Sequence, residues 1–160
     1  MSGEPVSDEK WRELLDGLVV QQAIIAEWPP EATCPEAERC EFSRHRTLAH
    51  LRAAQETWQE AVQLFAVNDK LSILRPHPWR LFKDLGYELV AWEEHKSKFL
   101  GDRQKWIELV SDPSLDRNRG GRLSGKPRMI ASLTELLVNH EKHHLVQLEV
   151  RAARNAKLRK

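Results

Sequence analysis

Apolar residues recur at spacings of three and four along four long stretches of the chain, the pattern of helices that each bury one face. These stretches cover residues 8–27, 43–67, 79–110 and 132–151. Ser7 and Ser43 precede the first two and can cap them, and Ser132 with Glu135 has the spacing of a capping box at the start of the last. No stretch alternates convincingly between apolar and polar residues, so we expect an all-α protein.

The segments between these stretches lack a clean period. Pro29 and Pro30 end the first stretch, and the segment that follows, to residue 42, is predicted to be a long crossover connection. Pro76 and Pro78 interrupt the pattern before the third stretch, and residues 111–126, rich in turn formers, are predicted to be a long loop. The expected fold is a four-helix bundle with a long first crossover connection, forming one domain over residues 1–160 with its core at about 8–150.

The third stretch carries two basic residues on its apolar side. Leu85, Leu89 and Phe99 mark that side, and Lys96 and Arg103 fall on it as well. We expect the stems of these two side chains to cover apolar surface while their charges reach solvent or the open end of the bundle. Gly86 and Gly101 leave the limits of this helix open.

Composition and charge narrow the classes of partner. The chain has 160 residues, enough for one core, and its net charge of +1 comes from 25 basic and 24 acidic residues, so no strong field recruits nucleic acid or an anionic membrane. The N-terminus does not resemble a signal peptide and no run reaches about 18 apolar residues, so a soluble, cytoplasmic protein is expected. The basic C-terminal stretch complements the negative end of the last helix, with an RNA or DNA tail as the alternative.

Cys34 and Cys40 are the two cysteines. Their spacing differs from the Cys-x-x-Cys of zinc and redox motifs. We therefore expect ordinary free thiols and look to other residues for metal chemistry.

Three histidines fall on faces that should be buried. His140 and His144 share a stripe with Leu133 and lie one turn apart on the last helix, where both rings can point at one ion. A single pair at this spacing is weak evidence, and the third candidate is His50, which shares its stripe with Trp58 on the second helix. If these two helices face each other, the three rings converge.

The remaining histidines are assigned other roles. His143 lies about 80° from the centre of the stripe by helix geometry, which favours a flanking or second-shell position. His45, His77 and His95 are expected on the surface or in loops. The alternative for any inward histidine is a hydrogen-bonded core residue, but three of them on facing helices would cost too much to bury without partners.

Two segments that carry these histidines resemble a known family. The run Phe-Ser-Arg-His-Arg-Thr-Leu-Ala-His-Leu from Phe42 is similar to the start of the second helix in the DinB-like superfamily of damage-inducible helical bundles. The resemblance continues through Phe99–Arg103 and Leu136–Leu148 and covers about residues 8–150. It implies that a divalent metal, commonly zinc or nickel, binds to His50, His140 and His144.

The resemblance also implies a style of chemistry. Relatives include transferases and isomerases that use small bacterial thiols, and others described only as metal-dependent hydrolases. A three-histidine site leaves the metal an open position. No residue is identified by the sequence as a general acid or base. Four residues can line the opening of the site, but each can equally have a structural role. These are Arg46, Thr47, Gln147 and Arg151.

Two functions of different class therefore stand. One is a metal-dependent enzyme that transfers a thiol or hydrolyses a small electrophile, with a small thiol or other small molecule as partner. The other is a non-catalytic metal-binding stress-response bundle. Because family members often pair through their helices, we also expect a homodimer.

Overall fold

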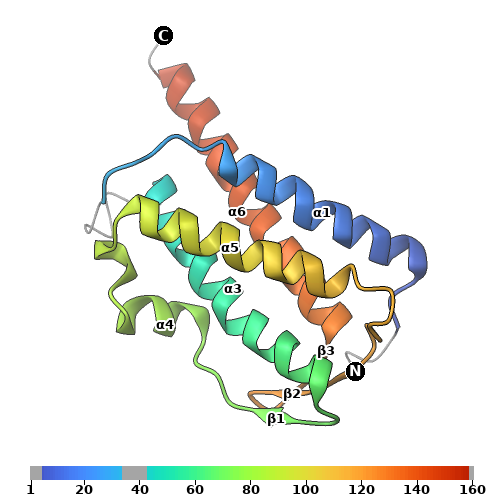
Figure 1. The fold of residues 1–160 in the computed structure, drawn as a ribbon. Coiled ribbons are helices and arrows are strands. Elements are labelled where there is room, and N and C mark those ends of the chain that lie inside the picture. The colour runs from blue at the N-terminus through green and yellow to red at the C-terminus, as the bar shows by residue number, and fades with distance from the viewer. Residues whose placement is uncertain (1–4, 34–42, 159–160) are drawn as a thin grey trace.

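The computed structural model describes residues 5–33 and 43–158 and is mostly helical, with one small sheet (Figure 1). The helices are α1 (Asp8–Ala26), α3 (Arg44–Val67), α4 (Pro78–Asp84), the 3-10 helix η1 (Tyr87–Leu89), α5 (Trp92–Val110) and α6 (Ile130–Leu158). The strands are β1 (Ser72–Ile73), β2 (Gly120–Leu123) and β3 (Lys126–Met129). Most of the predicted crossover, with Cys34 and Cys40, lies outside the described residues.

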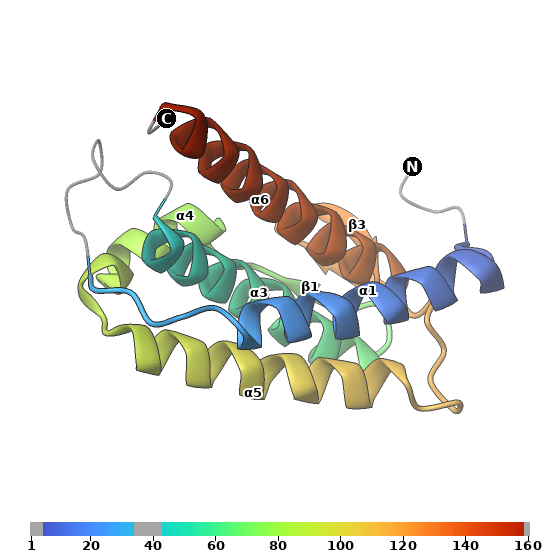
Figure 2. The same cartoon turned by 90° about the horizontal axis from the view of Figure 1, so that it is seen from above.

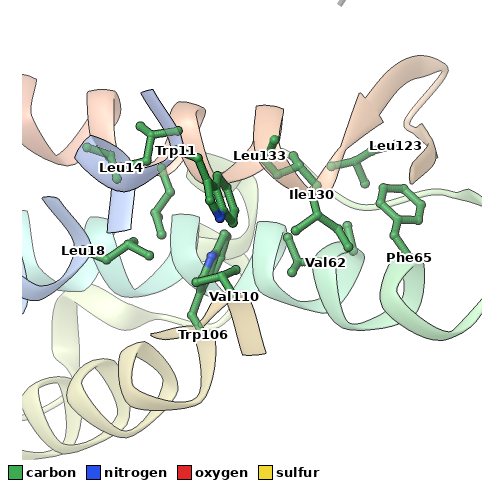
Figure 3. Close-up of a cluster of buried hydrophobic side chains, with 14 residues drawn as sticks. Trp11, Leu14, Leu18, Val62, Phe65, Trp106, Val110, Leu123, Ile130 and Leu133 are labelled. Atoms are coloured by element: carbon green, nitrogen blue, oxygen red, sulfur yellow. The ribbon is translucent and has the colours of Figure 1, made fainter. Parts of the chain in front are cut away.

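The four long helices pack around one core. Helix α3 packs against α5 and α6, and α1 packs against the same two, so α5 and α6 lie on opposite sides of the molecule (Figure 2). Apolar side chains from all four helices fill the space between them (Figure 3). The labelled members are Trp11, Leu14, Leu18, Val62, Phe65, Trp106, Val110, Leu123, Ile130 and Leu133. None of the described helices has the length and apolarity of a membrane span.

Two of the predicted helix starts are confirmed and one is wrong. The hydroxyls of Ser7 and Ser43 accept from the N–H groups of Lys10 and Arg46, which caps α1 and α3. The last helix begins at Ile130, before the predicted cap at Ser132, because β3 runs directly into it. Ser132 lies in the first turn of α6, and its hydroxyl accepts from the N–H of the residue before the helix.

The third long helix lies within the predicted stretch 79–110, but it does not fill that stretch. The stretch divides into α4, η1 and α5, and the division falls at Gly86, which adopts a left-handed conformation with φ 62°. Leu85 and Leu89, expected on the buried side, are 53% and 68% exposed. Helix α4 instead packs on α3, where Phe82 is fully buried.

The segment predicted as a long loop contains a hairpin. Strands β2 and β3 pair antiparallel, and they are joined by Ser124 and Gly125 at φ 50° and 82°, the pair of positive angles that a type I′ turn requires. Strand β1 pairs parallel to β2 and completes the sheet. A Cβ at Gly121 would lie 2.0 Å from the backbone oxygen of Leu71, so only glycine lets these two backbone segments approach this closely.

Lys96 is half-buried. The prediction that Arg103 reaches solvent is wrong, because this side chain is fully buried. Its Nε donates to Oε1 of Gln55 at 2.8 Å, one Nη donates to the backbone oxygen of Leu18 at 3.1 Å, and the other pairs with the carboxylate of Glu141. Glu141 is also fully buried, and burial raises the pKa of its carboxyl group. One guanidinium on α5 thus contacts α1, α3 and α6.

Buried glutamine side chains make further links of the same kind. Each donates from its amide nitrogen to a backbone oxygen on a neighbouring long helix, which satisfies a buried polar group across a helix interface. The pairs are Gln21 with Val138, Gln55 with Phe99 and Gln59 with Asp102, at 3.0, 2.9 and 2.7 Å.

Replacement of Glu141 by Gln should lower the free energy of unfolding by about 3–5 kcal/mol, since Arg103 cannot lose its proton and would remain a buried charge without a counterion. Arg103→Met should cost less, because Glu141 can then become neutral by taking up a proton. Urea denaturation of the metal-free protein measures both. Arg80→Ala, which removes an exposed 3.6 Å pair with Asp84, is the control and should change stability by less than about 0.5 kcal/mol. Equal small losses in all three variants would contradict this view of the core.

Candidate metal centre

The structure brings together the three histidines that the sequence indicated. His50 lies near the start of α3, and His140 and His144 lie one turn apart on α6. Nε2 of His140 is 3.1 Å from Nε2 of His50 and 3.2 Å from Nε2 of His144, and the three possible ligand atoms lie within 4.8 Å of one another. The facing of α3 and α6 that this convergence required is therefore present.

The separations of His140 from the other two nitrogens are close to those around one metal ion. Two imidazole nitrogens bound tetrahedrally to zinc at 2.0–2.1 Å would lie about 3.3–3.4 Å apart. Hydrogen bonding alone does not account for the cluster, because each Nε2 has either one proton or one lone pair and a single bond can satisfy only two of the three atoms. A cation that accepts all three lone pairs satisfies them together.

Aromatic side chains enclose the rings. Trp79 of α4 stacks on His50 with ring centroids 4.0 Å apart and planes 15° from parallel, and Trp58 meets His140 edge to face at 5.2 Å. The Nδ1 atoms of His50 and His140 are buried and have no hydrogen-bond partner among the described residues. The orientation of these two rings is therefore set by packing against the tryptophans.

Burial keeps the three imidazoles neutral. It is the largest cause that lowers the pKa of His50 to about 3 and that of His140 to about 4, and it lowers the pKa of His144 as well. Each ring also disfavours protonation of its neighbours, and the Arg46 guanidinium further lowers the pKa of His50. Neutral rings at pH 7 have the free lone pairs that a metal needs.

One strongly basic side chain, Arg46, lies beside the centre. Arg46 precedes His50 by one turn on α3, with its guanidinium 5.8 Å from the ring centroid of Trp79 and one N–H donating to Glu88 at 3.3 Å. Within the described part of the chain, the side chains that shift the pKa of the three rings are other histidines and Arg46. The geometry thus identifies no carboxylate as a general acid or base.

The other residues proposed for the opening of the site are placed as follows. Thr47 is buried, whereas Gln147 and Arg151 are half-buried. His143 is exposed, with its ring centroid 5.7 Å from that of His144, which agrees with a flanking position. His77 is exposed as predicted, at the start of α4.

The surface positions predicted for His45 and His95 are wrong, since both side chains are fully buried. Nδ1 of His95 accepts from Arg52 at 3.1 Å and its Nε2 lies 2.7 Å from the backbone oxygen of Tyr87, while Nε2 of His45 lies 2.6 Å from that of Val90. Both rings thereby fasten η1 and the residue after it. Helical periodicity missed them because η1 packs on α3 beside His45 and on His95 of α5.

Comparisons of the chain with protein-family models, with curated proteins and with solved structures found no match. The resemblance to the DinB-like superfamily accordingly stays a prediction, carried by the quoted segments. The geometry of the three histidines does not depend on it.

The metal-free protein should lose stability as the pH falls below about 6.5. The folded state lowers the pKa of His50 to about 3 and those of His140 and His95 to about 4, so below the ordinary value of 6.5 the unfolded state binds more protons. Above 6.5 this contribution is fully present. It should fall by at most about 1.4 kcal/mol per pH unit for each such histidine.

Urea midpoints measured in chelator between pH 7 and pH 5, where most carboxylates remain ionised, test this dependence. His95→Gln should give a shallower dependence than wild type, and the exposed control His143→Ala, which removes only a lesser influence on the pKa of His140 and His144, should change it less. A midpoint that does not change across this range would exclude neutral burial of the histidines.

Proposed function

We propose that this chain is a divalent-metal-binding protein of the DinB-like kind, in which His50, His140 and His144 hold zinc or nickel. The observation that carries the proposal is the convergence of three neutral Nε2 atoms from two facing helices. The packing of α1, α3, α5 and α6 around one core supports the four-helix bundle that the resemblance implies.

We further propose that the protein is an enzyme that transfers a small thiol to an electrophile, and we favour this activity over hydrolysis. When bound, the ion would supply a Lewis acid that lowers the pKa of a thiol or water at the position the three histidines leave open. The chain places the half-exposed Trp79 beside this position, where it limits water. Thiol transfer suits such a site better than hydrolysis, because a thiolate is already a strong nucleophile and needs no neighbouring carboxylate as base.

The second candidate is a non-catalytic metal-binding protein. Two observations favour it: aromatic rings from Trp58 and Trp79 cover the histidines, and the groups that act on them include no carboxylate in the described part of the chain. Metal content alone does not separate the two candidates, so binding and turnover need separate tests.

Protein purified without chelator or an affinity tag of histidines should contain about one equivalent of zinc or nickel. His50→Ala, His140→Ala and His144→Ala should each lose it, because two remaining imidazoles do not hold a divalent ion tightly. Elemental analysis measures the content. Addition of metal at about 1,000 times its dissociation constant should stabilise the metal-free wild type by about 4 kcal/mol in urea.

His143→Ala is the matched control, since its ring neighbours His144 but is exposed, and it should retain the metal. Circular dichroism on each variant shows whether the helices persist. Wild-type protein that neither contains metal nor takes it up would leave three packed core histidines and remove the proposal.

The enzyme proposal predicts metal-dependent turnover of small thiols with a simple electrophile such as an epoxide. The rate should fall at least about a hundredfold in chelator and in His144→Ala, because the ion is the activating group, and should return when metal is restored to wild type. Chromatography of the thioether product measures it. A metal-loaded protein without turnover across a broad panel would favour the non-catalytic candidate.

A further inference from the structure

Arg46 places a positive charge beside the candidate metal centre. It lies four residues before His50 on α3, so both side chains leave the same side of the helix about 6 Å apart along its axis. Its guanidinium carbon is 5.8 Å from the centroid of Trp79, the ring that stacks on His50 at 4.0 Å. The Arg46 charge also acts on His50, where it is one of the causes that lower the pKa.

The partner of Arg46 within the chain is held loosely. Glu88 accepts from one Nη of Arg46 at 3.3 Å, a long bond for a charged pair, and the Glu88 side chain is 36% exposed. A guanidinium has five N–H donors and binds a carboxylate best through two parallel bonds. The Arg46 side chain itself is 12% exposed, so Glu88 is the member of the pair that solvent reaches and that another carboxylate can replace.

The charge balance of the centre favours an anion. Three neutral imidazoles leave the charge of a divalent ion uncompensated, and the Arg46 guanidinium adds a positive charge beside them. A site with a guanidinium next to the ion and aromatic walls concentrates small anions.

We propose that the centre selects small molecules that carry a carboxylate, which Arg46 binds in place of Glu88 while another atom of the same molecule takes the open position on the metal. This inference rests on the proposed metal binding. It adds the substrate class and assigns Arg46 as the residue that recognises it.

Cobalt-loaded protein titrated with two thiols tests the inference. The probes are 3-mercaptopropionate and 2-mercaptoethanol, which share a thiol and differ in a carboxylate against a hydroxyl, and visible absorption of the cobalt reports their binding. Wild type should bind 3-mercaptopropionate at least about tenfold more tightly. Arg46→Gln should abolish this preference without changing the affinity for 2-mercaptoethanol.

Two further variants complete the design. Glu88→Gln should increase the preference, because it removes the competing carboxylate from Arg46. Arg44→Gln, on the same helix with an exposed side chain, is the control and should leave the preference unchanged. An opposite response in Arg46→Gln and Glu88→Gln is not expected from general loss of structure.

The outcomes separate the two proposals. If wild type does not bind cobalt, both the metal centre and this inference fail. If cobalt binds but the preference is absent, or survives in Arg46→Gln, the inference fails and the metal centre stands. Should Arg46→Gln not fold, an unchanged preference in Glu88→Gln overturns the inference by itself.

Discussion

A buried guanidinium group holds the helices that carry the candidate metal centre. Arg103 of α5 bonds to a backbone oxygen of α1, to Gln55 of α3 and to Glu141 of α6. Glu141 follows His140 directly, and Gln55 lies on the helix of His50. Because a buried charge tolerates little departure from its partners, this network restricts how α3 and α6 can slide past each other, and the distance between the histidine rings depends on that register.

Helix α4, which covers the candidate metal centre with Trp79, depends on a second buried network. His45, Arg52 and His95 hold the residues around η1 through a backbone oxygen of Tyr87, one of Val90 and the Tyr87 ring. Helix α4 precedes η1 and carries Trp79 onto the ring of His50. Histidines thus have two separate roles here: one set fixes the cover through hydrogen bonds, and the other presents free lone pairs beneath it.

Helical periodicity located the features that arise within one helix. The stripe holding His140 and His144 and the caps at Ser7 and Ser43 follow from a repeat of 3.6 residues and from orphan N–H groups in the first turn, and both are properties of the local sequence. The candidate site was found because its ligands lie on such stripes. Of the fold, the long helices at both ends of the chain and the second helix were placed this way.

Features that depend on a distant partner escaped prediction. A charged residue on an apolar stripe usually reaches solvent, and only the position of Glu141 shows why Arg103 does not. His95 is buried because η1 folds over it, and the hairpin forms because β1 pairs with β2. The turn of the hairpin is made by Ser124 and Gly125 at positive φ, and a serine at such an angle is uncommon, so the local sequence contains little indication of this turn.

The two connections between α3 and α6 differ in kind. These helices run in opposite directions (Figure 1), and at one end the sheet joins them, since β1 follows α3 and β3 leads into α6. Toward the other end the histidines meet across 90 residues of sequence. The sheet is a link that the backbone always makes, whereas the proposed metal would add a link through side chains alone, so the supply of metal in the surroundings would affect this end of the molecule and not the other.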